Sequence, residues 1–186
     1  MLILIWRTFA FGRRRVHAAS AGEERGGIAY AFGRGLMPWE KESARKHLPT
    51  YIAGVFYHSG IFSGMFYLLS VVVPFGLNVY ISQALRFLIT AGLLCGLALL
   101  VKRITLPYMR SISCPDDFVS NPMVNLFLVL ALLDPIVSSL RSVLFIVTII
   151  LFLYIPLGKI RHCFFFFYSR ILFGQFFGRR GAVVQR

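Results

Sequence analysis

The sequence predicts an all-α integral membrane protein, a bundle of four transmembrane helices, and leaves open a truncated fifth helix at the N-terminus. Of its 186 residues, 58% are hydrophobic and only 15% are charged, whereas a soluble domain has about 25% charged residues. The charges are separated by long apolar runs, and 47–85 contains no Asp, Glu, Lys or Arg. A chain with 16% aromatic residues is also too apolar to remain disordered in water.

Four segments are the candidate membrane spans, since a hydrocarbon core about 30 Å thick takes roughly 20 apolar residues to cross. They are about 50–73, 81–101, 119–133 and 142–158. The third is short, and we expect the fourth helix to continue past Lys159 to about Phe167. The opening segment, Met1 to Phe11, is apolar but about half as long as a span. It is therefore interpreted as the tail of a span or as a short interfacial helix.

The basic residues fall in three segments that four spans would place on one side of the membrane. Seventeen of the 20 Lys and Arg occur within 13–46, 102–110 and 159–186. The positive-inside rule makes that side cytoplasmic. The sequence thus predicts a multi-pass protein of the cytoplasmic (inner) membrane with a cytoplasmic C-terminus. We expect a basic N-terminal segment (1–49), a transmembrane bundle (50–168) and a basic tail (169–186), and no nucleic acid is needed to explain the net charge of +13.

Two histidines are candidate metal ligands. His58 lies roughly eight residues into the first span, about 12 Å deep at 1.5 Å per residue. His162 is expected in the last turns of the fourth helix, near the same membrane face. An ionisable side chain at membrane depth is costly and marks a candidate functional site. Two imidazoles on different helices at similar depth could supply both axial bonds of one haem iron.

Each of these histidines follows a glycine by four residues, Gly54 before His58 and Gly158 before His162. On a helix, residues four apart share a face, so each glycine would leave room for a porphyrin edge. The alternative is that glycine is common in membrane helices because it permits close packing, with both histidines merely hydrogen-bonded in the bundle. The residues alone leave both interpretations open. His47, at the membrane entrance, and His17, in the basic segment, are weaker ligand candidates.

Two segments, VFYHSGIF (Val55 to Phe62) and IPLGKIRHCFFFFYSR (Ile155 to Arg170), carry a family resemblance. They resemble the membrane cytochrome b of the respiratory nitrate reductase gamma subunit family. The relatives of that family include membrane subunits of sulfite-reduction-associated and heterodisulfide-reductase-like complexes. The resemblance covers about 45–170 and implies bis-His haem ligation between two helices. The family's second pair of ligands would fall on Leu68 and Leu144, so the resemblance implies a single haem, b-type, on His58 and His162. Of the family's first span, only Met1 to Phe11 could remain, either because the sequence starts at an internal Met or because that helix is lost.

The function that this resemblance implies is a b-type cytochrome subunit of a respiratory oxidoreductase complex. It would pass electrons between the quinone pool and a cytoplasmic iron–sulfur partner of the heterodisulfide-reductase-like or a similar type. Lys159 and Arg161, together with Arg45 and Lys46, lie near enough to the cytoplasmic face to pair with haem propionates. Gly60 and Gly64 would keep the haem-side packing tight.

Other features of the sequence leave alternatives open. Arg86, Asp134 and Arg141 could handle a quinone headgroup at the opposite face, or the quinone could bind beside the haem. Asp134 and the following proline are also a simple turn signal. The basic and Phe-rich stretch 163–177 could dock the partner and bind anionic lipid of the bilayer. The other interpretation of the whole chain is a haem-free membrane anchor or assembly subunit of a multi-subunit complex.

Overall fold

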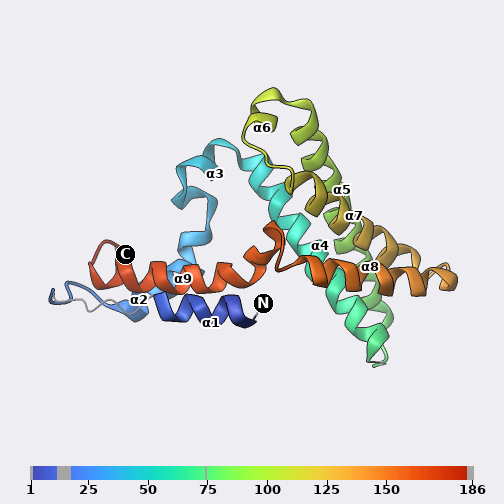
Figure 1. Ribbon diagram of the computed structural model, residues 1–186, viewed down its shortest axis with the longest axis horizontal. Helices are drawn as coiled ribbons and strands as arrows, with labels where there is room; N and C mark the ends of the chain where they lie inside the picture. Colours follow the sequence, from blue (N-terminus) through green and yellow to red (C-terminus); the bar gives the residue numbers. More distant parts are fainter. Residues whose placement is uncertain (1, 12–17, 74, 184–186) are drawn as a thin grey trace. The chain divides into compact units, whose positions relative to one another are not determined.

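The structure is a computed structural model that describes residues 2–11, 18–73 and 75–183 (Figure 1). All regular elements within these ranges are helical, which confirms the predicted all-α class for this part of the chain. The chain divides into two compact units. Unit 1 comprises residues 1–46 and 161–186, and unit 2 comprises residues 47–160.

Unit 2 contains the apolar helices. In chain order these are α4 (Leu48–Val72), α5 (Val79–Thr105), α6 (Pro107–Ser111), α7 (Asp117–Leu133) and α8 (Arg141–Tyr154), with a 3-10 turn, η3 (Ser138–Leu140), before the last. The 25 residues of α4 and the 27 of α5 are long and apolar enough to cross a membrane, as predicted for the first two segments. Helix α7 matches the third segment but has only 17 residues. A third span is present only if α8 and the following helix α9 (His162–Arg179) count as one broken span.

The predicted continuation of the fourth helix past Lys159 is wrong. Helix α8 ends at Tyr154, and a new helix begins at His162. The physical reason is Pro156, because a proline has no amide with which to continue the helical hydrogen-bond ladder. Ile155 before it still has helical backbone. The end of α8 could have been found in the sequence from that proline.

The core of unit 2 lies among α4, α5, α7 and α8. Its largest fully buried side chains include Ile89, Phe127, Leu128 and Leu144. Helices α4 and α5 approach closely where two glycines face each other. A Cβ added to Gly60 would lie 2.7 Å from the Cα of Gly92, a separation that real Cβ atoms do not adopt. This crossing is therefore restricted to glycine.

Unit 1 is built around a second close helix crossing. It contains α1 (Leu2–Phe11), α2 (Glu24–Phe32), α3 (Glu42–Lys46), α9, and the 3-10 turns η1 (Arg34–Leu36) and η2 (Pro38–Glu40). A Cβ added to Gly174 of α9 would lie 2.5 Å from the Cα of Ile28 in α2. The backbone amides of Ala21 and Gly22 donate to the carbonyl of Arg179. The Tyr168 hydroxyl donates to the Thr8 carbonyl at 2.7 Å, which connects α9 to α1.

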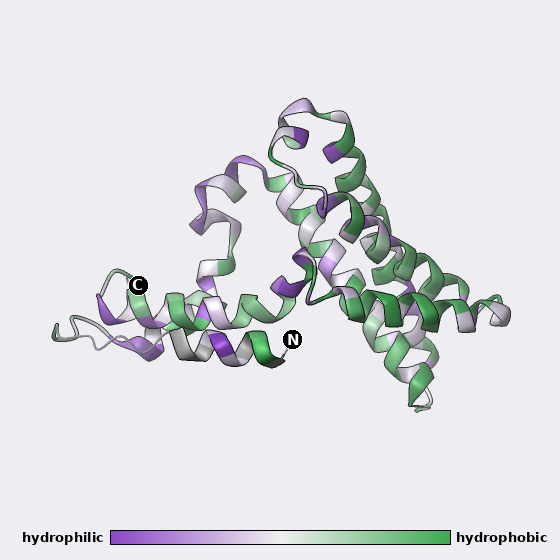
Figure 2. Cartoon of the chain, in the orientation of Figure 1, coloured by the Kyte–Doolittle hydropathy of each residue, from purple (hydrophilic) through white to green (hydrophobic). Residues whose placement is uncertain are grey.

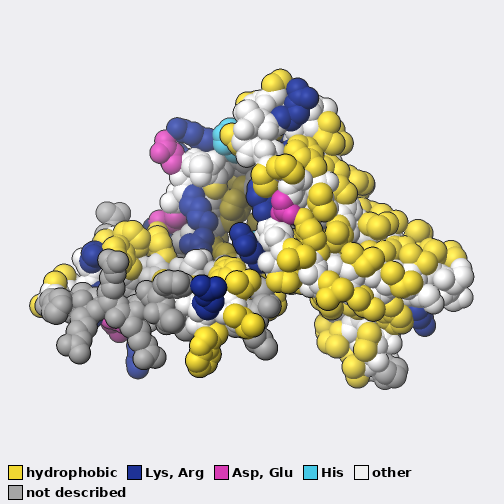
Figure 3. Space-filling view, viewed as in Figure 1, with side chains coloured by type: hydrophobic (Ala, Val, Ile, Leu, Met, Phe, Trp, Pro, Cys, Tyr) yellow, Lys and Arg dark blue, Asp and Glu magenta, His cyan; other side chains and the backbone are white. Residues whose placement is uncertain are grey.

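Hydropathy separates the two units. Figure 2 shows α5 and α8 as almost continuously hydrophobic, whereas polar and apolar residues are mixed over α2, α3 and α9. Hydrophobic side chains cover most of the visible surface of unit 2 in Figure 3. Much of this surface is not covered by the chain itself, since only 22% of the most apolar window of α4 and 17% of that of α5 are buried. These helices are therefore compatible with contact to a lipid bilayer.

Candidate functional site

His58 is positioned by the third turn of α4, on a face that unit 2 leaves exposed. Its Nδ1 lies 2.7 Å from the carbonyl oxygen of Gly54, one turn earlier. A Cβ added to Gly54 would meet nothing within 4 Å. The glycine therefore leaves open space on the same helix face as the imidazole.

The hydrogen bond of His58 determines which ring nitrogen can bind a metal. A carbonyl oxygen only accepts, so Nδ1 carries the hydrogen and Nε2 carries the lone pair. Metal-binding histidines usually donate their other ring N–H to a carbonyl or carboxylate in this way. His58 and Gly54 thus fit one axial position of a haem, by donor chemistry and by the space beside the ring.

His162 belongs to unit 1 and is the first residue of α9, where it is exposed. Gly158 lies in unit 2, outside any helix, so the expected shared helix face of Gly158 and His162 is wrong. A Cβ added to Gly158 would lie 2.8 Å from a carboxylate oxygen of Asp116. Packing within unit 2 therefore explains this glycine without a cofactor.

The other two histidines of the chain are His47 and His17. His47 is the residue before the first turn of α4 and is exposed. His17 lies outside the described residues. Within the described ranges, no three His, Cys, Asp or Glu side chains are grouped so that they could hold a metal ion. A haem iron takes at most two ligands from the protein, so the absence of a group of three does not bear on a haem site.

Of the expected propionate partners, Lys159 is already bound to a carboxylate. Its Nζ lies 2.6 Å from Oδ2 of Asp117, so binding a propionate would compete with this ion pair. Lys46 pairs with Glu42 at 2.6 Å within α3. Arg161 is exposed at the N-terminus of α9. Arg161 is thus better placed than Lys159 or Lys46 to bind a propionate.

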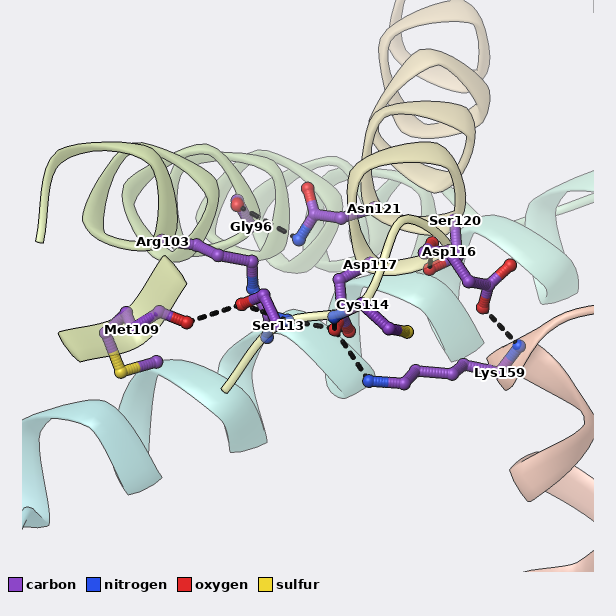
Figure 4. A network of polar contacts seen from close by, with 10 residues as sticks. All are labelled: Gly96, Arg103, Met109, Ser113, Cys114, Asp116, Asp117, Ser120, Asn121 and Lys159. Atoms are coloured by element: carbon purple, nitrogen blue, oxygen red, sulfur yellow. Dashed lines mark hydrogen bonds and ion pairs between the residues drawn. The ribbon is translucent and has the colours of Figure 1, made fainter. Parts of the chain in front are cut away.

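A polar network at the N-terminus of α7 was not anticipated from the sequence (Figure 4). Asp117 is 7% exposed, and its two carboxylate oxygens each accept from a cation at 2.6 Å, one from Arg103 and one from Lys159. The backbone amide of Cys114 donates to the same carboxylate at 3.0 Å. This network ties the end of α5 and the segment after α8 to the start of α7.

The neighbouring carboxylate extends the network. Asp116 accepts from the backbone amide of Lys159 at 2.5 Å and from the Tyr154 hydroxyl. Burial raises the pKa of the Asp117 carboxyl, but the hydrogen bonds from Lys159 and Cys114 and the charge of Arg103 outweigh it, so the pKa is lowered. The hydrogen bond to Asp117 in turn raises the pKa of Lys159. The signal available in the sequence was an Asp-Asp pair directly before an apolar segment.

Gly60 and Gly64 do not lie beside His58, contrary to expectation. Both are buried on the face of α4 that packs against other helices. Gly60 meets Gly92 of α5, and a Cβ at Gly64 would lie 3.0 Å from the Phe127 ring of α7. These glycines stand in G-x-x-x-G spacing, a pattern that marks helix contacts in membranes. That pattern could have identified their role.

Leu68 and Leu144, where the resemblance would place a second pair of ligands, belong to the hydrophobic core of unit 2. Leu68 is 7% exposed and Leu144 is fully buried. Both side chains are packed among the residues of α4, α7 and α8.

At the other end of α7, Asp134 is more than a turn residue. It ends the helix, as the turn interpretation expected, and its side chain is fully buried. It accepts from Tyr67 Oη at 2.5 Å and from two nitrogens of Arg141 at 3.1 and 3.2 Å. The ion pair confirms that Asp134 and Arg141 lie together. Arg86 lines a small cavity of about 120 Å³ that Tyr67 also borders.

Comparison with protein-family models, with curated proteins and with solved structures gives no match to this chain.

Proposed function

We propose that the protein is a membrane-bound b-type cytochrome subunit that carries a single haem with His58 and His162 as axial ligands. In this proposal it is an electron-transfer subunit of a respiratory oxidoreductase complex, linking the quinone pool to a cytoplasmic iron–sulfur partner. The similarity of the segments around both histidines to the nitrate reductase gamma subunit family supports this. The topology proposed is four spans in the cytoplasmic membrane, with the basic segments and the C-terminus in the cytoplasm.

The observation that carries the proposal is the environment of His58. The imidazole stands on a helix of membrane-spanning length, with Nδ1 oriented by the Gly54 carbonyl at 2.7 Å. The space beside Gly54 is open within 4 Å. A histidine at this depth is costly without a function, and an oriented ring beside an open face is what an axial ligand requires.

The chain's own residues have limited tasks in this proposal. The haem supplies the one-electron chemistry, and the histidines hold it and tune its potential. Gly54 would leave room for the edge of the porphyrin. The Arg161 guanidinium would bind a propionate by a charge-assisted hydrogen bond. Lys159 stays with Asp117. The buried Asp134–Arg141 pair and the cavity beside Arg86 are the proposed place for a quinone headgroup on the other side of the membrane, and a quinone pocket beside the haem is the alternative.

The test is optical and uses the purified full chain expressed with haem supplied. Reduced-minus-oxidised spectra should show a b-type α band, with one haem per chain by pyridine hemochrome assay. His58→Ala and His162→Ala should each abolish the band, whereas the matched variant His47→Ala should retain it. Gly54→Leu should also abolish it while leaving the helical circular dichroism unchanged, because the added side chain fills the open face. Absence of haem from the well-folded protein would contradict the proposal.

A second candidate function is a haem-free membrane anchor or assembly subunit. Its support is the exposure of the span surfaces, since 22% of the α4 window and 17% of the α5 window are buried within the chain. Such helices suit partner subunits as well as lipid. This function would be favoured if His58→Ala and His162→Ala left the spectrum and the assembly of a complex unchanged.

A further inference from the structure

The net charge of the protein is concentrated in unit 1. This unit has 14 Lys and Arg against four Asp and Glu in 72 residues, whereas unit 2 has six against three in 114 residues. Unit 1 therefore carries +10 of the total charge of +13. A charge this large and of one sign, on a small unit, is a feature of surfaces that bind anions.

The acidic residues of unit 1 cannot neutralise this charge. Glu24, Glu40 and Glu42 each pair with one cation, respectively Arg179, Arg34 and Lys46. Elsewhere in the unit, cations lie near one another. The pKa of Lys41 is lowered by burial and by the charge of Arg170, so these two cations repel each other in the absence of an anion.

The same unit exposes large aromatic side chains. Both tryptophans of the chain are in unit 1, and Trp6 is 78% and Trp39 65% exposed. On α9, Phe164, Phe167 and Ile171 share one face by helical spacing and are all exposed. Tryptophan and other aromatic side chains are enriched where a protein meets the headgroup layer of a membrane.

Cations and aromatic rings are also direct neighbours on α9. The guanidinium carbon of Arg180 lies 3.4 Å from the centroid of the Phe176 ring, and that of Arg170 lies 5.5 Å from the centroid of Phe166. These cation–π contacts keep positive charge beside apolar surface. In Figure 3, dark blue side chains stand next to yellow ones on this part of the chain.

A glycine crossing holds α2 and α9 of unit 1 together. Gly27, Gly174 and Gly178 bring the backbones of α2 and α9 into contact, and Gly174 and Gly178 are the buried residues of α9. By helical spacing, Phe167 lies on the same side of α9 as these glycines. Its ring stacks on Phe32 of α2 with centroids 6.3 Å apart, yet it stays 56% exposed. The helix pair therefore leaves apolar surface uncovered beside the crossing.

We propose that unit 1 is an interfacial module that binds the surface of a bilayer containing anionic phospholipid, with its aromatic residues in the headgroup layer and its cations on lipid phosphates. A surface both basic and aromatic matches this occupant, because anionic headgroups attract the cations and the acyl boundary takes the rings. This proposal goes beyond electron transfer and is independent of the haem.

The test uses the full chain in lipid nanodiscs, where the two tryptophans report on unit 1 alone. Nanodiscs of phosphatidylcholine are compared with nanodiscs that also contain phosphatidylglycerol, both with and without brominated acyl chains. We expect blue-shifted emission and strong bromine quenching in the anionic nanodiscs. The quenching should decrease at 1 M salt, where the Debye length is about 3 Å.

Variants that remove positive charge show whether unit 1 binds the lipid through its cations or merely lies close to the bilayer. Arg170→Gln with Arg180→Gln should weaken the association about 30-fold, since each cation near an anionic surface contributes about a fivefold factor. The salt concentration that halves the quenching should fall accordingly. Arg110→Gln, in unit 2, is the matched control and should leave it unchanged. Far-UV circular dichroism checks that the variants are folded.

Two results would overturn the proposal. One is tryptophan emission and quenching that are equal in neutral and anionic nanodiscs. The other is quenching that neither salt nor the Arg170 and Arg180 substitutions reduce. Either result would indicate that the exposed aromatic surface of unit 1 binds a protein partner instead of lipid.

Discussion

Both units contain a close helix crossing at glycines, but they differ in how their charged side chains are paired. In unit 2, Gly60 and Gly92 bring α4 and α5 into backbone contact, and in unit 1, Gly174 does the same for α9 against α2. In unit 2, the carboxylates of Asp117 and Asp134 are buried and paired with cations. Unit 1 has an excess of ten positive charges that its own acids cannot balance. Charge pairs therefore stabilise unit 2, whereas the charge of unit 1 is mostly of one sign.

This difference can be tested most directly at Asp117. Replacing it by Asn removes the negative charge from two cations at 2.6 Å while keeping the shape of the side chain. Removing one partner of a buried ion pair costs about 3–5 kcal/mol, and because Arg103 and Lys159 are partly exposed we expect a loss of about 3 kcal/mol. Unfolding in detergent, followed by far-UV circular dichroism, measures it.

The matched comparison for that variant is an exposed pair in unit 1. Glu42 and Lys46 lie 2.6 Å apart with side chains 81% and 68% exposed. Exposed helical pairs contribute only about 0.3–0.5 kcal/mol, so Glu42→Gln should hardly change stability. Equal losses for Asp117→Asn and Glu42→Gln would show that the two units do not differ in this respect.

Much of the helical architecture of unit 2 could be predicted from the sequence, because an apolar run of membrane length has few other solutions. The predicted starts of the first two spans fall within two residues of α4 and α5. The break before His162 was missed because hydropathy continues across it, and only Pro156, which has no amide to donate, indicates it. Residues 161–186 belong to unit 1 and not to the unit of the preceding helices. The hydropathy of the sequence does not indicate this division.

A methyl group added at either glycine crossing should lower the stability of the unit that contains it. Gly60→Ala should destabilise unit 2 by about 2 kcal/mol, because its Cβ would meet the backbone of α5 and overpacking costs about 1–3 kcal/mol. Gly174→Ala should have a similar effect on unit 1. Tryptophan fluorescence, which reports on unit 1, should show the Gly174→Ala loss and not the Gly60→Ala loss.

Gly54→Ala is the control for both crossings. It lies in the same helix as Gly60, but its added Cβ would meet nothing within 4 Å. Alanine is favoured over glycine in a helix by up to about 1 kcal/mol, so the cofactor-free variant should be as stable as the parent or more stable. A loss at Gly54→Ala as large as that at Gly60→Ala would contradict the close-packing explanation.

The candidate site was less predictable than the helices. The chemistry of His58 follows from residue type and depth, and the structure adds the hydrogen bond to Gly54. Gly158 was misassigned because residues four apart share a face only within a continuous helix. The partners of Asp117 come from α5 and from the segment after α8. Contacts between residues so distant in sequence leave no local pattern.

A smaller effect is expected at the other buried carboxylate of unit 2. Tyr67→Phe removes the hydroxyl that donates to Asp134 at 2.5 Å, while Arg141 remains bound. Hydrogen bonds to charged groups contribute about 1.5–3 kcal/mol, and the retained ion pair should limit the loss to about 1.5 kcal/mol. Circular dichroism in detergent measures it. Tyr80→Phe is the control, since Tyr80 is 76% exposed, and a loss there of the same size would refute the role of the hydroxyl.

The smallest effect is a pH dependence that should distinguish the units. The pKa of Asp117 is lowered in the folded protein, so its contribution is complete above the unfolded pKa of about 3.9 and is lost as pH falls through the folded value. The circular dichroism transition should therefore weaken as pH falls below about 4, and Asp117→Asn should remove that part of the change. In unit 1, the hydrogen bond from Arg34 lowers the pKa of Glu40, with the same sign. Because the Arg34 side chain is 51% exposed, solvent screens the pair. Its loss should appear only as a minor shift in the tryptophan signal, which Glu40→Gln should abolish. A tryptophan transition more acid-sensitive than the helical one would reverse the assignment of structural charge to unit 2.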